Sequence, residues 1–160
     1  MEFTDRHKLT PEQLELLEAA HKAMDNRYSP YSHFSVGAAV LGEGGDITAG
    51  ANVENASYGL TICAERVAMV KAMTDGDTKC TKIAIIARGE KGPVEKPVTP
   101  CGACRQFILE MAQVGNNDIE VIMSNTDMTS IMICGINELL PYGFGPRDLG
   151  VIEKTTEPAD

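Results

Sequence analysis

Cys63-Ala64-Glu65 and, further along, Pro100-Cys101-Gly102-Ala103-Cys104 are the two stretches that decide the fold of this chain. Together they place three thiols and one carboxylate in the order C-x-E … P-C-x-x-C. Zn²⁺ binds thiolates well, and a catalytic zinc keeps three protein ligands and leaves its fourth position for water. A carboxylate two residues from a ligand can reach that water without binding the metal. The pattern therefore predicts a catalytic zinc site with Cys63, Cys101 and Cys104 as ligands and Glu65 as the acid.

A closed structural zinc site is the alternative interpretation, because Cys80 or Cys134 could supply a fourth thiolate. A single C-x-x-C is also found in redox pairs and disulfides. Neither Cys80 nor Cys134 has a C-x-x-C partner, however, and each lies in an apolar stretch where a buried, small hydrophobic residue is expected. Glu65 would have no role in a structural site. The order of the motif is typical of zinc-dependent nucleobase deaminases, so the catalytic interpretation is favoured.

Composition predicts one compact domain over residues 1–160, with a core of about 10–149 and a tail at 150–160. The chain carries 14 Lys and Arg against 23 Asp and Glu, which gives a net charge of −9. Because this charge repels a phosphate backbone, nucleic acid is disfavoured as a partner.

The cysteine count and the N-terminus indicate a cytoplasmic protein. Five cysteines form an odd number, which argues against a secreted disulfide framework. The N-terminus has charged residues and no apolar signal segment, and no apolar run reaches the roughly 18 residues that span a bilayer. We therefore expect neither export nor a membrane partner.

Hydrophobic periodicity alternates between helix and strand patterns along the whole chain. Thr10-Pro11-Glu12-Gln13 predicts a helix start with Thr10 as N-cap and Gln13 closing a capping box. Further helices are expected at 61–73 and 101–111, and strands at 36–41, 47–52, 83–87, 119–123 and 130–134, the first two joined as a hairpin. This order predicts a three-layer α/β/α fold with a mixed five-stranded sheet.

Both parts of the cysteine motif fall near predicted helix N-termini. Cys101 and Cys104 are three residues apart, so they share one helical face and can bind one ion. The positive end of the helix dipole lowers thiol pKa values there. Arg66 and Arg105 are adjacent to the motif and are candidates to hydrogen-bond the sulfurs, with a surface ion pair as the alternative for either.

Five sequence blocks, in order, show that the chain resembles the small, all-cysteine, homotetrameric cytidine deaminases. The resemblance covers about residues 28–149, most of the chain. Besides the two zinc-motif blocks, which extend to Arg66 and to Arg105-Gln106, the blocks are Tyr31-Ser32-His33-Phe34-Ser35-Val36-Gly37-Ala38-Ala39, Asn52-Val53-Glu54-Asn55-Ala56-Ser57-Tyr58 and Glu138-Leu139-Leu140-Pro141 with Phe144-Gly145-Pro146. The resemblance implies a cytidine deaminase-like fold and one zinc ion per chain.

The resemblance also implies a role for each matching residue. Cys63, Cys101 and Cys104 match the family's zinc ligands. Glu65 matches the proton shuttle, which moves a proton from the zinc-bound water to the pyrimidine N3 and then to the leaving amine.

Other matching residues would bind the substrate and join subunits. Phe34 matches the aromatic that packs on the pyrimidine, Asn52 and Glu54 match the pair that binds the ribose 3′-hydroxyl, and the backbone around Ala64 would contact the base. Phe144 matches an aromatic that enters a neighbouring subunit's pocket, which implies a tetramer with shared sites. Without the resemblance, an Asx turn, a solvated acid and a core aromatic would be the simpler interpretations of Asn52, Glu54 and Phe34.

The function expected from these observations is hydrolytic deamination of cytidine and 2′-deoxycytidine to uridine and 2′-deoxyuridine, with release of ammonia. The carboxylate of Glu54 would repel a phosphate, so nucleosides are favoured over nucleotides. Gly59 and Thr61 stand where the family commonly has Pro and Gly, and the 88–99 loop looks longer than usual. A deaminase of a modified cytosine nucleoside or nucleoside antibiotic is therefore an alternative, and a non-catalytic zinc-binding interaction module is another.

Overall fold

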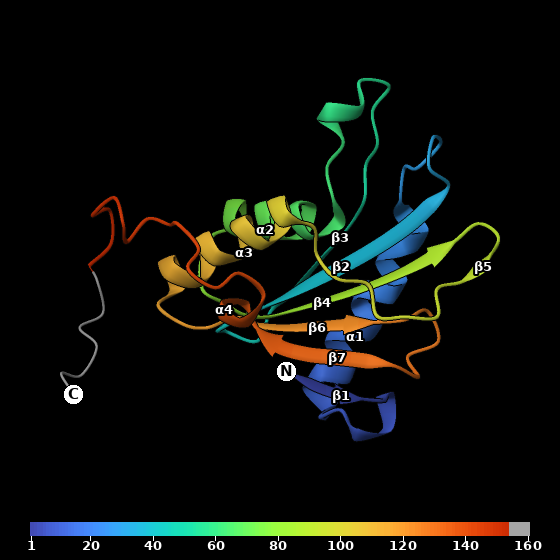
Figure 1. Cartoon of the computed structure of the whole chain (residues 1–160), viewed down its shortest axis with the longest axis horizontal. Helices are drawn as coiled ribbons and strands as arrows, with labels where there is room; N and C mark the ends of the chain where they lie inside the picture. The colour runs from blue at the N-terminus through green and yellow to red at the C-terminus, as the bar shows by residue number, and fades with distance from the viewer. Residues whose placement is uncertain (154–160) are drawn as a thin grey trace.

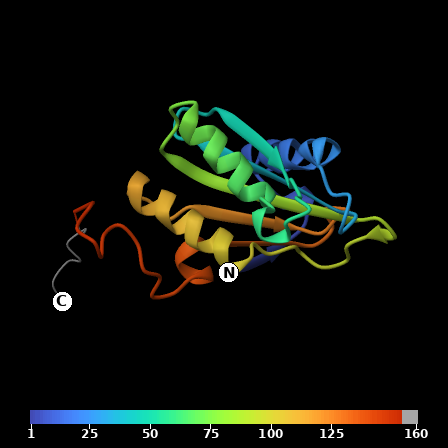
Figure 2. The same ribbon diagram turned by 90° about the horizontal axis from the view of Figure 1, so that it is seen from above.

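A mixed β-sheet lies between helices on both of its faces in the computed structural model, which describes residues 1–153 (Figures 1 and 2). Helix α1 (Pro11–Ala23) packs on one face, and α2 (Ala64–Thr74) and α3 (Gly102–Gly115) pack on the other, where the short α4 (Ile136–Leu139) contacts α3. Short 3₁₀ helices occur at Arg6–Lys8, Met24–Asn26 and Tyr58–Leu60. Residues 154–160, in the expected tail, lie outside the described residues.

The sheet has the strand order β1-β7-β6-β4-β2-β3, with β5 paired to β4. The strands are β1 (Glu2–Thr4), β2 (Phe34–Gly42), β3 (Ile47–Ala51), β4 (Cys80–Gly89), β5 (Gly92–Pro93), β6 (Glu120–Ser124) and β7 (Ile131–Gly135). Strands β4 and β6 pair in parallel, and the other pairs are antiparallel.

The expectation of a five-stranded sheet is wrong, because the sheet formed by residues 1–153 has seven strands. The two additional strands are β1, with three residues, and β5, with two. Segments this short cannot show the alternation of apolar and polar residues that identifies a strand in a sequence. They pair because the chain brings their backbones beside β7 and β4.

The capping box and the hairpin predicted from the sequence are both confirmed. Thr10 Oγ1 accepts from the Gln13 N–H at 3.2 Å, and Gln13 Oε1 accepts from the Thr10 N–H at 3.0 Å. Strands β2 and β3 pair antiparallel around a turn closed by the Gly42 N–H donating to the Asp46 carbonyl at 2.9 Å. Gly45 has a φ of 92° in this turn, a conformation that glycine adopts without strain.

The core has one layer on each face of the sheet. In β4, Ile83 and Ile85 face α2 and α3, whereas Ala84 and Ile86 face α1. This period of two is the pattern of a strand buried on both faces. No helix in the described part of the chain is long and apolar enough to cross a bilayer.

The connections of the sheet place α2 and α3 side by side. Strands β3 and β4 both run antiparallel to β2, so they are parallel to each other, and β4 is parallel to β6. The crossovers β3-α2-β4 and β4-α3-β6 move in the same direction across the sheet, and crossovers of one hand then put both helices on the same face. Each helix begins at the carboxyl end of the strand before it, so both N-termini lie at the same edge of the sheet.

Candidate active site

Three thiols meet at that edge. Cys63 is the N-cap of α2, Cys101 is the N-cap of α3, and Cys104 lies in the first turn of α3. The three sulfur atoms all lie within 4.8 Å of one another, and the Sγ atoms of Cys101 and Cys104 are 3.6 Å apart. All three cysteines are free thiols. Three converging soft ligands that form no disulfide fit a zinc ion.

The electrostatics of this cluster favour a thiolate at Cys63. A hydrogen bond from Cys104 and the guanidinium of Arg66 lower the pKa of Cys63 to about 5. The pKa of Cys104 is raised, because its thiol donates to Cys63 and is buried. A cation bound here would take the place of the proton that these thiols share.

Glu65 stands two residues after Cys63 in the first turn of α2 and is only 5% exposed. Burial raises the pKa of this carboxyl above its ordinary value, and the negative charge of Cys63 acts in the same direction. Cys80 and Cys134, the possible fourth ligands, are buried in the core behind α2 and α3 and are not part of the thiol cluster.

The two neighbouring arginines make different contacts. Arg66 Nη2 donates to the Thr61 carbonyl at 2.9 Å and to Cys63 Sγ at 3.8 Å, so it lies against the cluster. Among residues 1–153, Arg105 makes neither of the contacts expected for it. Its Nε donates to the Pro100 carbonyl at 3.0 Å and its Nη1 to the Leu139 carbonyl at 3.1 Å, both on the main chain.

Asn52 and Glu54 hold the segment that carries Phe34. Asn52 is buried; its Oδ1 accepts from the Val36 N–H and its Nδ2 donates to the Phe34 carbonyl, each at 2.9 Å. Glu54 Oε2 accepts from the main-chain N–H groups of Tyr31 at 2.9 Å and Ser32 at 3.2 Å. A hydrogen bond from the Ser32 hydroxyl, and to a smaller extent these main-chain contacts, lower the pKa of Glu54.

A cavity of about 370 Å³ opens beside Glu54 and is lined by Tyr31, Ser32, Glu54, Tyr58 and Thr61. The rings of Tyr31 and Tyr58 meet edge to face, with centroids 5.6 Å apart. Sequence reasoning assigned no role to the Ser32 and Thr61 side chains in this cavity. For Thr61, the sequence offered one indication of such a role, which is its position just before the predicted zinc ligand Cys63.

Comparison with known proteins agrees with this geometry. Residues 11–116 match the family described as the cytidine and deoxycytidylate deaminase zinc-binding region. This chain belongs to that family. A cytidine deaminase from Halalkalibacterium halodurans is 42% identical over 134 residues, which cover 84% of this chain and 95% of the relative. A probable cytidine deaminase from Dictyostelium discoideum is also 42% identical, over 88% of this chain and 90% of its own length.

The fold is shared with solved structures of the family. The crystal structure of cytidine deaminase from Burkholderia pseudomallei aligns with a TM-score of 0.73 at 38% identity and covers 85% of this chain and 100% of its own. The cytidine deaminase from Mycobacterium tuberculosis aligns with a TM-score of 0.65 at 32% identity, over 82% and 95% of the two chains. The cytidine deaminase-like α/β fold is therefore confirmed.

Ala64 and Phe144, which are both predicted to contact the substrate, differ in burial and in their position along the chain relative to the thiols. Ala64 is fully buried in the first turn of α2, between Cys63 and Glu65. Phe144 is 62% exposed, follows α4, and is not among the residues that line the cavity beside Glu54.

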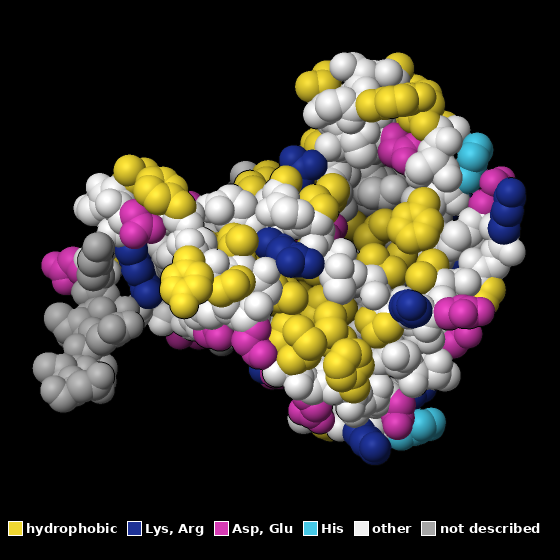
Figure 3. Space-filling view, in the orientation of Figure 1, with side chains coloured by type: hydrophobic (Ala, Val, Ile, Leu, Met, Phe, Trp, Pro, Cys, Tyr) yellow, Lys and Arg dark blue, Asp and Glu magenta, His cyan; other side chains and the backbone are white. Residues whose placement is uncertain are grey.

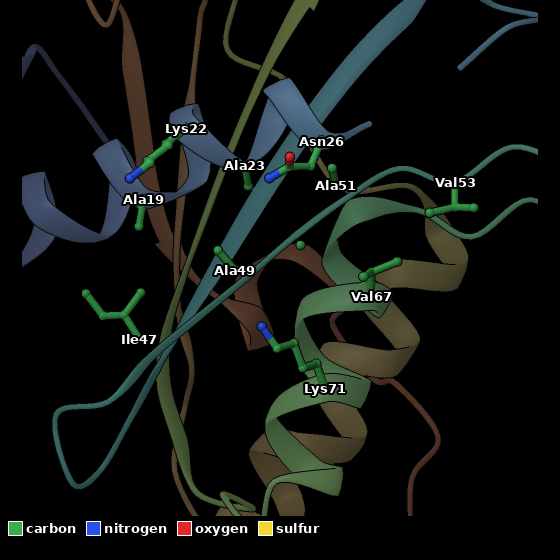
Figure 4. A pocket seen from close by; sticks show the side chains of 11 residues that line it. Ala19, Lys22, Ala23, Asn26, Ile47, Ala49, Ala51, Val53, Val67 and Lys71 are labelled. Atoms are coloured by element: carbon green, nitrogen blue, oxygen red, sulfur yellow. The ribbon is translucent and has the colours of Figure 1, made fainter. Parts of the chain in front are cut away.

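A larger cavity, of about 540 Å³, lies away from the residues expected to carry the deaminase chemistry. It is a groove between α1 and α2 along β3, with the side chains of Lys22 and Lys71 at its sides (Figure 4). It is lined mostly by alanine and valine and contains none of the predicted site residues. Cavity size alone would therefore point to this groove and not to the thiol cluster.

Proposed function

We propose that this chain is a zinc-dependent cytidine deaminase that converts cytidine and 2′-deoxycytidine to uridine and 2′-deoxyuridine, with release of ammonia. The observation that carries the proposal is the convergence of Cys63, Cys101 and Cys104 beside the buried carboxyl of Glu65. The relatives named cytidine deaminase support the choice of substrate.

The thiols of Cys63, Cys101 and Cys104 would hold one zinc ion per chain, with Arg66 donating to Cys63 and offsetting part of the thiolate charge. When bound, zinc supplies a Lewis acid that brings the pKa of a water molecule toward neutrality. The N-termini of α2 and α3 add positive potential at the same point.

Glu65 is the proposed proton carrier. In the reaction, water adds to C4 of the pyrimidine, the C4–N4 bond breaks and ammonia leaves. Glu65 accepts one proton from the water and delivers it to the ring N3; it then takes the remaining proton from the hydroxyl added at C4 and gives it to the leaving amine, so that C4 becomes a carbonyl. Because burial raises its pKa, Glu65 is a stronger base than an exposed glutamate.

The substrate would be held mainly by the segment 31–36 and the residues that fix it. Phe34 would pack on the pyrimidine ring, and the backbone at Ala64 would contact the base edge. Glu54 uses one oxygen, Oε2, for both of its main-chain contacts, so Oε1 can accept from the ribose 3′-hydroxyl. Asn52 keeps a second Nδ2 hydrogen for the same hydroxyl.

Exposed apolar side chains support assembly into a tetramer with shared sites. Residues 53–62 form an arm above the sheet, and Figure 3 shows apolar side chains gathered on it. Tyr58 on this arm is 73% exposed, and Leu60 and Phe144 are also exposed. Exposed apolar surface of this kind marks interfaces, and Phe144 would close the pocket of a neighbouring copy. We further propose that residues 1–160 form one domain and that the enzyme is cytoplasmic.

The test is Glu65→Gln, with Glu110→Gln on exposed α3 surface as the matched control. We expect Glu65→Gln to fold and to keep stoichiometric zinc. Its deamination should fall by more than the roughly 10²–10⁴-fold typical of one proton transfer, because one residue serves several transfers. Near-normal turnover in Glu65→Gln would refute the proposed role of Glu65 as proton carrier. Loss of zinc from the same variant would favour a structural role for the site.

Ammonia release should be measured with cytosine, cytidine, deoxycytidine, CMP and N4-substituted cytidines. Thr61 lines the cavity beside Glu54, where the related enzymes commonly have glycine, and this is the observation that favours a modified cytosine nucleoside as second candidate. A preference for N4-substituted substrates would select that candidate. Inactivity on the whole panel with zinc bound would favour the interaction module.

A further inference from the structure

From the last residue of α4 onward, the chain is held against α3 along residues 139–147, which we name the C-terminal strap (Figures 1 and 2). Side chains of α3 make the contacts. Arg105 Nη1 donates to the Leu139 carbonyl at 3.1 Å, and Gln106 Nε2 donates to the Phe144 carbonyl at 2.7 Å. Further along the helix, Gln113 Oε1 accepts from the Arg147 N–H at 3.1 Å. Three hydrogen bonds therefore join the backbone of the strap to side chains of α3.

Gly143 and Gly145 let the strap pack closely against α3, and the Phe144 ring between them is exposed to solvent. A Cβ atom on Gly143 would lie 2.5 Å from Leu109 Cδ2, and one on Gly145 would lie 2.5 Å from Gln113 Oε1. These distances are shorter than real Cβ contacts, so both positions lie directly against α3. Phe144 stands between them with its ring exposed, and Tyr142, with φ of 57°, is exposed as well.

Of these three hydrogen bonds, one is made to Phe144, the residue with the exposed ring. Gln106 donates to the carbonyl of Phe144 itself, whereas the other two hydrogen bonds are made by the main chain of Leu139 and Arg147. Gln106 also lies two residues beyond Cys104, in the part of α3 that begins at the thiol cluster. The same helix thus holds two of the metal-ligating thiols and the ring that the chain presents outward.

We infer that Gln106 is a positioning residue, which fixes where the Phe144 ring stands through its hydrogen bond to the Phe144 carbonyl. The inference rests on the proposed function, in which Phe144 closes the nucleoside pocket of a second copy. Gln106 touches neither the zinc ligands nor the proton carrier in the described contacts, so it acts on the reaction only through Phe144.

The first experiment is Gln106→Met in the full chain, which keeps the size of the side chain and removes the donor. We expect the KM for cytidine to rise about threefold to tenfold, the effect of losing one hydrogen bond, with kcat within about twofold and zinc content unchanged. Gln113→Met is the matched control, because it is the same substitution on the same helix against the same strap. It should change KM by less than about twofold.

A double-mutant cycle with Phe144→Ala separates positioning from a general effect on the helix. If Gln106 acts through Phe144, Gln106→Met should add no further rise in KM when Phe144 is already alanine. Additive losses, an unchanged KM in Gln106→Met, an equal rise in Gln113→Met, or loss of zinc would each overturn the assignment.

A fluorescence measurement tests the same contact without turnover. The chain contains no tryptophan, so Phe144→Trp introduces a single indole at the strap. We expect Gln106→Met in this background to lower the anisotropy of the indole and to increase its quenching by acrylamide, and Gln113→Met to do so less. An unchanged indole would refute the positioning role. If the indole responds but the chain deaminates no nucleoside, the contact stands and the proposed function fails.

Discussion

Gly50 in β3 lies directly against α2, and adding one methyl group there tests how strictly the sheet positions the metal site. A Cβ atom at position 50 would lie 2.7 Å from the Ala68 nitrogen and 2.8 Å from Val67 Cγ1, whereas ordinary contacts begin near 3.4 Å. The nearest atom belongs to the helix backbone, which cannot rotate away as a side chain can. In Gly50→Ala, α2 must therefore move from β3 by about 0.7 Å, the difference between 3.4 and 2.7 Å.

This displacement has an expected cost in stability and in metal affinity. Overpacking of this kind costs about 1–3 kcal/mol, and each kcal/mol lowers the Tm of a chain of this size by about 2–4 °C, so we expect a fall of about 2–12 °C. Helix α2 begins at Cys63, and metal–ligand distances tolerate only about 0.2 Å of error. Zinc affinity should therefore fall together with Tm, as measured by thermal unfolding and by competition with a chelator.

Gly59→Ala is the matched control, because no atom of the described residues lies within 4 Å of a Cβ atom at that position. It should change the free energy of unfolding by less than about 0.5 kcal/mol and leave zinc affinity as it was. If Gly50→Ala has the Tm and zinc affinity of the parent chain, the reasoning that β3 sets the position of α2 is refuted.

Three further predictions concern the metal, the carboxylate beside the cavity, and assembly. Cys104→Ala should abolish zinc binding, whereas Cys80→Ala, an equally buried thiol, should keep one zinc per chain by metal analysis; a zinc requirement for Cys80 would indicate a closed structural site. Contacts with Ser32 lower the pKa of Glu54, so its contribution to stability is present above the ordinary carboxyl pKa and is lost as pH falls through the lowered value. Glu54→Gln should therefore lower Tm at neutral pH by an amount that shrinks in acid, and a pH-independent difference would contradict this. Sedimentation should show a tetramer, and Phe144→Ala should raise the KM for cytidine with zinc retained; a fully active monomer at assay concentration would refute the shared site.

The placement of Cys101 and Cys104 on one helical face was predictable because its constraint is local. Cys101 and Cys104 lie on one turn of helix wherever that helix is placed, and Glu65 lies two residues from Cys63 at another helix start. The capping box at Thr10 was predictable for the same reason, since all its atoms lie within four residues. Helix geometry was sufficient for these local features, and no long-range contact had to be known.

Contacts between distant segments could not be obtained in this way. Asn52 and Glu54 matched substrate-binding positions, but their hydrogen bonds to the 31–36 segment became visible only in the fold. Arg105 stood beside a zinc ligand in the sequence, yet it binds the carbonyl of Leu139, which belongs to the short helix α4. Strands β1 and β5 are too short for any periodicity, and they exist because of their neighbours in the sheet.

The sequence by itself determined which residues are candidates to bind zinc and to carry the proton, because those properties belong to residue types and to spacing within one helical turn. The tertiary structure decided that Cys63 meets Cys101 and Cys104, because two crossovers in the same direction place α2 and α3 on one face with their N-termini at one edge. It also decided that Glu65 is buried, and burial is what raises its pKa. Solvent exclusion and the meeting of distant segments are properties of the packed chain, which spacing along the sequence does not specify.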